Sequence, residues 1–335
     1  MATIKDVARK AGVSTATVSH VINGTRIVAV ATSEAVRQAM LDLDYSPSVY
    51  GRALRTRTLK QIGYVVADLT NPFFAAVFSG VEQLALQQGY TVVVSHSGED
   101  AELEERAVSG LIARGVDGLI IAPVAQSRLC ESTDALAVPV VLIDRDCGSG
   151  HIPSVTTQMD GAIYQAVEAL HMAGFQDIGF MAGRAGLSTT DHRLQAYHHA
   201  MEMLGLVARV FEGDSRMESG RDAVDWAGNL VAPFGMICGN NLMAMGFVQE
   251  LLQRGLMEQW GNGIVVIDDE VWTTFTTPAV SVIAQPTVEI GEQSMELLLA
   301  TVQHDAIVKP SVRLPCHFEA RGILATTMME EGTNG

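Results

Sequence analysis

The chain has 335 residues, of which 48% are hydrophobic and 18% are charged, and its formal net charge is −16. This composition excludes a disordered protein, and the length predicts two or three folded domains. No apolar run approaches the roughly 20 residues that a membrane-spanning helix needs. The N-terminus lacks the apolar segment of a signal peptide, so we expect a cytoplasmic protein with no membrane partner.

Charge is distributed unevenly along the chain. Residues 1–60 contain nine Lys/Arg and four Asp/Glu, a balance of +5, whereas the remaining residues contain 13 basic and 34 acidic groups. A basic N-terminal segment on an acidic body is typical of a local phosphate-binding module, because only that module must neutralise phosphates.

Three short helices are predicted in the first 45 residues. Thr3, with Asp6 three residues later, is placed to cap the first helix. Ser14 is placed to cap the second, and Thr32 or Ser33 to begin the third. The apolar residues at helical spacing are Ile4, Val7, Ala8 and Ala11, then Val18, Val21 and Ile22, then Val36, Met40 and Leu43.

The first two helices, joined by a Gly-containing turn, match the helix-turn-helix pattern. Spacing alone leaves open a simple pair of helices with an exposed polar face. In the helix-turn-helix interpretation, the small polar side of the second helix reads bases, because Thr methyls and Ala contact thymine methyls and His20 bonds a base edge. The expected DNA-binding residues here are Thr15, Ala16, Thr17, Ser19, His20, Asn23 and Arg26.

A basic run follows the turn at Tyr45-Ser46-Pro47. The segment SVYGRALRTRTLK places four Lys/Arg around a leucine. A solvated linker seldom contains such a leucine, whereas an apolar wedge with flanking arginines suits insertion into the minor groove. We therefore expect Leu54 and Arg55 to contact DNA, which favours the helix-turn-helix interpretation.

The run TIKDVARKAGVSTATVSHVINGTRIVAVATSEAVRQAMLDLDYSPS, followed by GRALRTRT, closely resembles the LacI/GalR family of bacterial transcription regulators, and the resemblance continues to about residue 322. It implies that residues 48–56 form a hinge helix with Leu54 as the minor-groove wedge. Ser48 and Gly51 depart from the usual Asn and Ala of that helix. The base-reading positions that it implies are Thr15, Ala16 and His20.

From residue 61 the chain alternates apolar strands with amphipathic helices. The predicted strands are IGYVVAD, YTVVVSH, DGLIIAP, VPVVLID, DIGFMAG, FGMICG and GIVVID. The predicted helices lie near 74–89, 100–114, 160–173, 191–204, 241–254 and 286–303. This alternation implies parallel sheets with helices on both faces. The number of units exceeds one sheet, so we expect a pair of similar α/β lobes.

Ligands of such folds bind at the carboxyl ends of strands, so the residues directly after strands are candidates for ligand contact. Aromatic rings, amides, carboxylates and guanidinium groups at these positions suit a neutral polyhydroxy ligand. Each residue alone could instead serve as a turn residue, a core aromatic or part of an internal ion pair. The candidates are Asn71, Phe73, Phe74, Asp144, Arg145, Arg193, Asn240, Asp268 and Gln285.

By the same resemblance, the acidic body is an effector domain similar to periplasmic sugar-binding proteins. The ribose-binding members match these candidate positions, which implies a pentose or nucleoside effector. Segments around the pocket depart from the usual pattern: Gly239-Asn240-Asn241 stands for GND, and Gln158-Met159 for DN. A hexose, a sugar phosphate or a purine stays open as an alternative.

The remaining signals predict neither metal nor cofactor. Cys130, Cys147, Cys238 and Cys316 form no CxxC pair, so we expect reduced, buried thiols and no disulfide. No catalytic constellation is found, so we expect no enzyme activity.

We thus expect a repressor that binds double-stranded operator DNA as a homodimer or higher oligomer and responds to a small molecule between two lobes. A cytoplasmic sugar-binding protein or a sugar-acting enzyme is the alternative outside this class. The expected domains are residues 1–46 (helix-turn-helix), 47–59 (hinge helix and linker) and 60–330 (effector binding and dimerisation). The last divides into lobe 1, about 60–157 and 287–317, and lobe 2, about 158–286 and 318–328.

Overall fold

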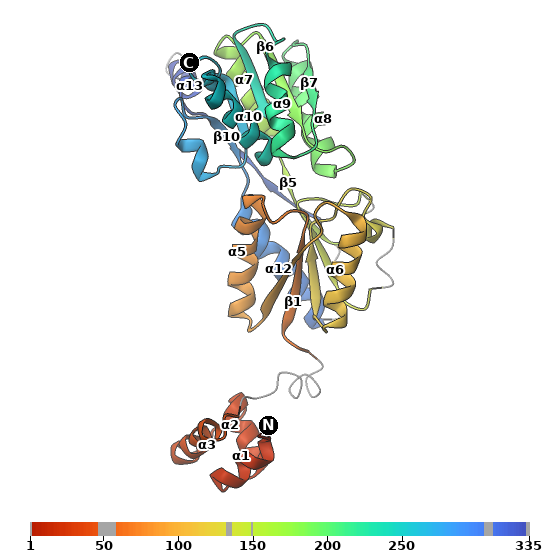
Figure 1. The fold of residues 1–335 in the computed structure, drawn as a ribbon, viewed down its shortest axis with the longest axis vertical. Coiled ribbons are helices and arrows are strands. Elements are labelled where there is room, and N and C mark those ends of the chain that lie inside the picture. Colours follow the sequence, from red (N-terminus) through yellow and green to blue (C-terminus); the bar gives the residue numbers. More distant parts are fainter. Residues whose placement is uncertain (1, 46–57, 132–135, 149, 305–310, 333–335) are drawn as a thin grey trace. The chain divides into compact units, whose positions relative to one another are not determined.

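The computed structural model describes residues 2–45, 58–131, 136–148, 150–304 and 311–332 (Figure 1). The chain forms two compact units, Met1–Leu59 and Lys60–Gly335. Across the described ranges, no helix has both the length and the apolar character that crossing a membrane requires. The predicted hinge contacts Leu54 and Arg55 lie outside the described residues.

The first unit contains the helices α1 (Ile4–Ala11), α2 (Thr15–Asn23) and α3 (Val30–Asp42). The predicted caps of the first two helices are confirmed: the Asp6 carboxylate accepts hydrogen bonds from the Thr3 N–H (2.9 Å) and hydroxyl (2.7 Å). Ser14 Oγ accepts one from the Thr17 N–H at 3.1 Å.

The predicted start of α3 at Thr32 or Ser33 is wrong. The helix begins at Val30, and its capping residue Ala29 offers only its backbone carbonyl, which accepts from the Ser33 N–H at 2.9 Å. The first turn of this helix thus forms without a side-chain cap.

The apolar faces of these helices meet in one small core. Val7, Ala8, Val18, Val36 and Ala39 are buried, and the partly buried Val21 and Ile22 pack against them. This arrangement confirms the predicted inner side of α2. Its opposite side, with Thr15 and Ala16, is exposed.

The second unit contains two six-stranded sheets, one in each of two lobes. All pairings of the first sheet are parallel. In spatial order its strands are β11 (Ser311–Pro315), β5 (Ser154–Gln158), β4 (Val140–Ile143), β3 (Gly118–Ile121), β1 (Gln61–Val66) and β2 (Thr91–His96).

The second sheet has the same layout, with one antiparallel strand at its edge. In spatial order its strands are β12 (His317–Glu319), β10 (Ser281–Ala284), β9 (Ile264–Ile267), β8 (Phe234–Cys238), β6 (Asp177–Ala182) and β7 (Arg209–Glu212). Two similar α/β lobes were predicted, and this is confirmed. The strands β5, β7, β11 and β12 and the helices α9 and α13 were not predicted, because they are short or weakly periodic.

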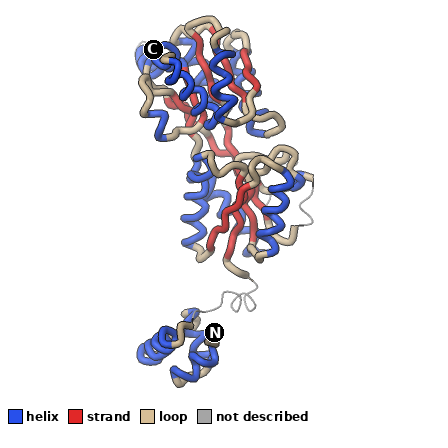
Figure 2. The backbone as a smooth tube through the Cα atoms, viewed as in Figure 1, coloured by secondary structure: helices blue, strands red, loops and turns tan. Residues whose placement is uncertain are grey.

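Helices cover both faces of each sheet (Figure 2). In lobe 1, α5 (Pro72–Gln87) and α12 (Thr287–His304) pack on one face and α6 (Ala101–Ala113) on the other. In lobe 2, α7 (Asp160–Met172) and α8 (Ser188–Met203) pack on one face, and α9 (Met217–Ala227) and α10 (Asn241–Arg254) on the other. Alternate strand residues face opposite layers, as the period of a strand requires. The remaining elements are α11 (Met257–Trp260), α13 (Ile323–Gly332), η1 (Arg128–Cys130), η2 (Gly261–Gly263) and η3 (Val271–Thr274).

The chain crosses between the lobes after β5, after β10 and between β11 and β12 (Figure 1). These crossings hydrogen-bond to one another. The Cys316 N–H donates to the Gln158 carbonyl (3.1 Å), and the Thr157 hydroxyl donates to Oε1 of Gln285 (3.1 Å). Hydrogen bonds between the crossing segments therefore connect the lobes near the carboxyl ends of their strands.

The expectation of four reduced cysteines is wrong for one pair. Cys130 and Cys147 form a disulfide with their Cα atoms 5.1 Å apart, whereas Cys238 and Cys316 are free and buried as expected. The bonded pair follows the neighbouring parallel strands β3 and β4, whose carboxyl ends lie at one sheet edge. The spacing of the cysteines in the sequence could not show that Cys130 and Cys147 become neighbours.

Candidate functional site

Two aspartates occupy equivalent positions in the two lobes. Asp144 directly follows β4 and Asp268 directly follows β9, and these strands hold the same place in the two sheets. Both residues have left-handed backbone, with φ of 63° and 81°. A non-glycine residue adopts this conformation rarely, and such strain gathers at ligand sites.

A hydrogen bond and an ion pair connect these aspartates to residues of both lobes. Gln285 donates from Nε2 to Oδ1 of Asp268 at 2.5 Å. Arg193 of α8 donates from Nη1 to the Gly239 carbonyl at 3.0 Å, and its Nη2 lies 3.8 Å from Oδ1 of Asp144. Arg193 therefore links an acid of lobe 1 to the end of β8 in lobe 2.

Burial changes the ionisation of both acids. It raises the pKa of Asp268 to about 6, although Arg193 and the Gln285 hydrogen bond favour the carboxylate. It also raises the pKa of Asp144, against the opposing charges of Arg145 and Arg193. Desolvation of the charged form is the main cause in each case.

Two asparagines and a phenylalanine complete this part of the site. Asn71 Oδ1 caps α5 by accepting from the Phe73 N–H (3.1 Å), and Asn240 Oδ1 caps α10 by accepting from the Met243 N–H (3.1 Å). Their amide nitrogens remain available as donors because the caps use only the oxygens. Phe73 is almost fully buried, with its ring edge-on to that of Phe74.

The site encloses a cavity of about 20 Å³, comparable to a single water probe. Seven of the nine candidates predicted from the sequence line it: Asn71, Phe73, Asp144, Arg193, Asn240, Asp268 and Gln285. Groups of both lobes close on one another here, so a sugar-sized ligand requires the lobes to separate or these side chains to move.

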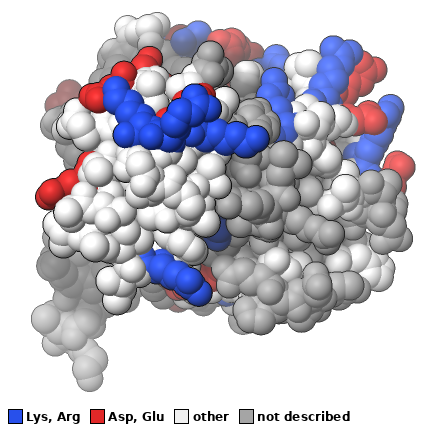
Figure 3. Space-filling model, turned by 90° about the horizontal axis from the view of Figure 1, so that it is seen from below, with Lys and Arg blue, Asp and Glu red and all other residues white. Residues whose placement is uncertain are grey.

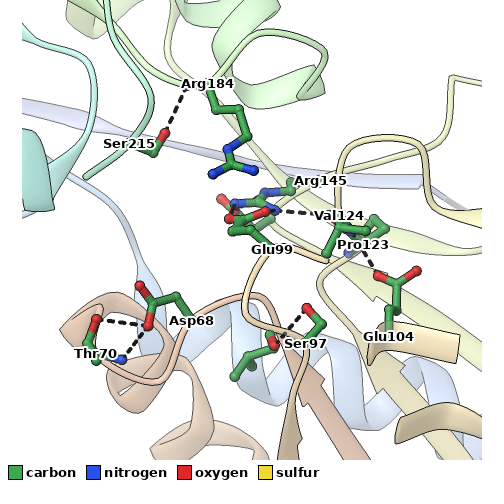
Figure 4. Close-up of polar contacts among 12 residues, drawn as sticks. Asp68, Thr70, Ser97, Glu99, Glu104, Pro123, Val124, Arg145, Arg184 and Ser215 are labelled. Carbon is green, nitrogen blue, oxygen red and sulfur yellow. Dashed lines mark hydrogen bonds and ion pairs between the residues drawn. The ribbon is translucent and has the colours of Figure 1, made fainter. Parts of the chain in front are cut away.

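The other two candidates do not line this cavity. Phe74 belongs to the core of lobe 1, where its carbonyl accepts a hydrogen bond from the Tyr64 hydroxyl at 3.0 Å. Arg145 pairs with both carboxylate oxygens of Glu99, at 2.7 and 3.0 Å, and donates to the Pro123 carbonyl (Figure 4). Its guanidinium thus joins the segments that follow β2, β3 and β4 within lobe 1.

Several residues around the cavity were missed from the sequence. Ser215 follows β7, and its hydroxyl accepts from the Arg184 N–H at 2.9 Å (Figure 4). The others are Gly183, Thr189, Thr190 and Gly239. Recognising β7 as a strand would have pointed to Ser215, because the same rule of strand ends applies to it.

Two larger cavities adjoin this cluster. One of about 250 Å³ contains Asp144, His192, Arg193 and Arg313. The other, of about 420 Å³, contains Arg145, Asp146, Ser188, His192 and both bonded cysteines. Both draw their walls from the two lobes.

The DNA-binding candidates of the first unit lie on or just after α2. Thr15 and Ala16 are exposed, and Ser19 and His20 are half-buried. Nδ1 of His20 lies 2.8 Å from the Thr25 hydroxyl, which orients the ring. Thr17 serves the cap, with its hydroxyl 2.9 Å from that of Ser14. Asn23 ends α2, and Arg26 is exposed beyond it.

The charge of the described helices is nearly balanced. Residues 2–45 contain five Lys/Arg and four Asp/Glu, and Arg9–Asp6 (3.3 Å) and Lys10–Asp42 (2.8 Å) are ion pairs. Figure 3 shows Lys and Arg in separate groups, several beside Asp or Glu, on the face seen from below. Most of the basic excess of the N-terminal sixty residues therefore comes from residues 52–60.

Known families match both units of the chain. Residues 3–48 match the bacterial regulatory proteins of the lacI family, and residues 59–322 match the periplasmic binding proteins and sugar binding domain of LacI family. The chain belongs to the LacI family. The predicted resemblance and fold class are thereby confirmed, and this LacI-family chain is a DNA-binding transcriptional regulator with a separate effector domain.

Whole-length relatives and solved structures agree with this assignment. The chain is 34% identical over 315 residues to the HTH-type transcriptional repressor PurR of Glaesserella parasuis, covering 90% of this chain and 91% of that protein. It is 31% identical over 309 residues to PurR of Aliivibrio salmonicida, covering 90% and 93%. The lac repressor bound to ONPG in a repressed state is 29% identical, with a TM-score of 0.81 and coverage of 96% and 98%. These relatives are repressors and not enzymes, as expected.

Proposed function

We propose that this LacI-family chain is a cytoplasmic repressor that binds a near-palindromic operator as a homodimer. Its operator affinity is controlled by a small molecule between the lobes, and we favour a sugar of the ribose or nucleoside type. We also propose the division of labour of the predicted domains: residues 1–46 and 47–59 bind DNA, and residues 60–330 bind the effector and dimerise.

The observation that carries the effector proposal is the cluster around Asp268. Carboxylate, amide and guanidinium groups from both lobes meet beside the Phe73 ring. Such groups pair with sugar hydroxyls, and the ring stacks on C–H faces. A ligand that bonds to both lobes stabilises one lobe arrangement over another, and this difference is the linkage that changes operator affinity.

Operator binding is supported by the placement of α2 and by a solved relative. The lac repressor dimer bound to operator and the anti-inducer ONPF is 29% identical to this chain, with a TM-score of 0.82 and coverage of 96% and 99%. We assign base contacts to Thr15, Ala16 and His20, with Ser19, Asn23 and Arg26 beside them. Thr17 acts through the cap of α2. Leu54 and Arg55 are assigned to the minor groove.

The sugar type is supported by a second relative and is the part of the proposal most open to test. A putative ribose operon repressor from Burkholderia thailandensis is 28% identical, with a TM-score of 0.68 and coverage of 78% of this chain and 99% of that chain. The alternatives are a hexose, a sugar phosphate and a purine, because the amide and guanidinium groups suit each of them.

A thermal-shift panel of D-ribose, D-glucose, adenosine, hypoxanthine and ribose 5-phosphate tests this proposal. We expect D-ribose or adenosine to raise the melting temperature, and Asp268→Asn to weaken binding of that compound about tenfold or more, as for loss of a hydrogen bond to a charged group. Asp225→Asn is the matched control, because Asp225 is an exposed acid of α9 that pairs with Arg254. Stabilisation by hypoxanthine or ribose 5-phosphate alone would refute the ribose-type effector.

A further inference from the structure

The disulfide between Cys130 and Cys147 lies where lobe 1 faces lobe 2. Cys130 ends η1 in the segment after β3, and Cys147 lies in the segment after β4. Both cysteines are half-buried, and both line the cavity of about 420 Å³ whose walls come from the two lobes. The disulfide therefore lies in the wall of a cavity large enough to admit a small solute.

The two segments that the disulfide joins both lie next to the N-terminal end of α8 in lobe 2. The Asp146 N–H donates to the Ser188 hydroxyl at 3.0 Å. A Cβ built on Gly186 would lie 3.8 Å from the Cβ of Ala125. The same helix carries Arg193 of the candidate effector site. The disulfide thus connects two segments that lie beside lobe 2, one of which hydrogen-bonds to it.

Buried polar contacts hold the inner ends of these segments. Arg145 bonds to Glu99 and to the Pro123 carbonyl, and Glu104 accepts from the Val124 N–H at 2.8 Å and from the Ser127 hydroxyl (Figure 4). The disulfide joins the outer ends, three residues beyond the anchor at Ser127 and two beyond the anchor at Arg145. Breaking it leaves the inner anchors intact and gives the outer ends more freedom.

We propose that Cys130 and Cys147 form a reversible thiol–disulfide exchange site whose state controls closure of the two lobes. The co-reactant is a low-molecular-weight thiol. Its thiolate attacks one cysteine sulfur, breaks the S–S bond and forms a mixed disulfide, while the other cysteine leaves as a thiolate and takes up a proton. A second thiol then releases the first cysteine as a thiol. Two thiols are oxidised to one small disulfide, and two cysteines are reduced.

This inference rests on the proposed cytoplasmic function in one respect: a disulfide in that compartment is usually transient and redox-sensing. The other two cysteines provide an internal contrast. Cys238 and Cys316 are buried among core residues, and burial raises the pKa of both thiols. They are therefore poor partners in exchange, since the thiolate is the reactive form.

The first test follows the chemistry in the full chain, without effector or DNA. The protein is equilibrated in graded mixtures of reduced and oxidised glutathione, quenched in acid, alkylated with N-ethylmaleimide and weighed by mass spectrometry. We expect two alkylated cysteines to appear and disappear reversibly while the protein stays folded, and peptide mapping to place them at residues 130 and 147. Failure of the disulfide to form, or its persistence in millimolar reduced glutathione, would overturn the proposal.

The second test measures lobe closure by hydrogen exchange. We expect amides of residues 144–148 and 186–190 to exchange about fivefold faster in the reduced protein. The Cys130→Ser/Cys147→Ser variant should exchange at that faster rate in both glutathione buffers. Equal protection of the oxidised and reduced wild-type protein would refute the control of closure. Neither test uses an effector, so a wrong effector assignment leaves both readouts unchanged.

Discussion

Asp268 combines burial, a left-handed backbone and a hydrogen bond from Gln285. Its equivalent in lobe 1, Asp144, faces Arg193 at 3.8 Å. A buried carboxylate at these two positions does not improve packing, because an uncharged residue of the same size would avoid the cost of burying a charge. The strain and the desolvation therefore point to ligand contact at these two positions.

The raised pKa of Asp268 predicts a pH dependence of stability. Its pKa is about 6 when folded and 3.8 for the free side chain, so the folded state binds the proton more tightly. That stabilisation is complete below pH 3.8 and is lost as the pH rises through 6. The free energy of unfolding of the wild type should thus fall relative to Asp268→Asn by about 2–3 kcal/mol between pH 4 and pH 7.5. Urea unfolding at several pH values measures this difference.

The control for this prediction is Asp225, an exposed acid whose pKa is lowered by its hydrogen bond from Arg254. Its contribution is fully present above the free value of 3.8 and is lost as the pH falls from there through its lowered pKa. The wild type and Asp225→Asn should therefore differ by a constant amount between pH 5 and pH 7.5. An equally constant difference for Asp268→Asn would contradict the assignment of the raised pKa.

At the scale of elements, glycines decide how closely helices approach. A Cβ on Gly80 of α5 would collide with the Val288 carbonyl of α12, and one on Gly291 of α12 with the Val77 carbonyl of α5. The helices α9 and α10 approach each other equally closely at Gly220 and Gly246. In each pair the backbones touch directly, so these positions tolerate no side chain.

Gly291→Ala should destabilise lobe 1 by about 2–3 kcal/mol, because the added methyl forces α12 away from α5. Gly161→Ala in α7 is the matched control, since a Cβ there meets no atom within 4 Å. That change should be neutral or should stabilise the protein by up to about 1 kcal/mol. Urea unfolding of both variants measures the contrast, and equal effects would refute the packing argument.

The hinge element carries the second prediction at this scale. Residues 48–56 lie outside the described part of the chain, and the role of Leu54 as a minor-groove wedge stays a prediction. Leu54→Ala should weaken binding to an operator duplex selected from a random DNA pool, because the wedge keeps the minor groove open. Its thermal shift with D-ribose should match that of the wild type. Unchanged DNA affinity in fluorescence anisotropy would contradict the wedge.

At the scale of the molecule, charge and domain boundaries indicate that DNA binding and effector binding belong to different compact units. Residues 1–60 have a balance of +5 on a chain of net charge −16, and the compact units meet between Leu59 and Lys60. The acidic effector unit repels DNA, so DNA affinity must come from the first unit.

Removal of residues 1–59 should therefore separate the functions. The remaining chain, residues 60–335, should show no binding to DNA at any salt concentration and should keep the ligand-induced thermal shift of the full chain. DNA affinity of the full chain should fall steeply with added salt, because bound phosphates release counterions. Residual DNA binding by residues 60–335 would show that the acidic unit contributes contacts of its own.

The sequence by itself determined the elements with strong local signals. These are the caps at Thr3 and Ser14, the apolar faces of the first helices and the longer strands. Each depends on residues that are close in sequence, so periodicity and side-chain chemistry are enough to predict it. Seven of the nine effector candidates lie around one cavity for a related reason, since residues after parallel strands gather at one sheet edge.

Only the tertiary structure decided which strand ends are neighbours and which side chains meet across them. Arg145 bonds to Glu99 and does not line the candidate cavity, and Phe74 lies in the core of lobe 1. Ser215 joins the site from the end of a strand that is too short to predict. The disulfide is the clearest case, because Cys130 and Cys147 are 17 positions apart in sequence and become neighbours only when β3 pairs with β4. Pairing between distant strands is a long-range property, and no local pattern in the chain encodes it.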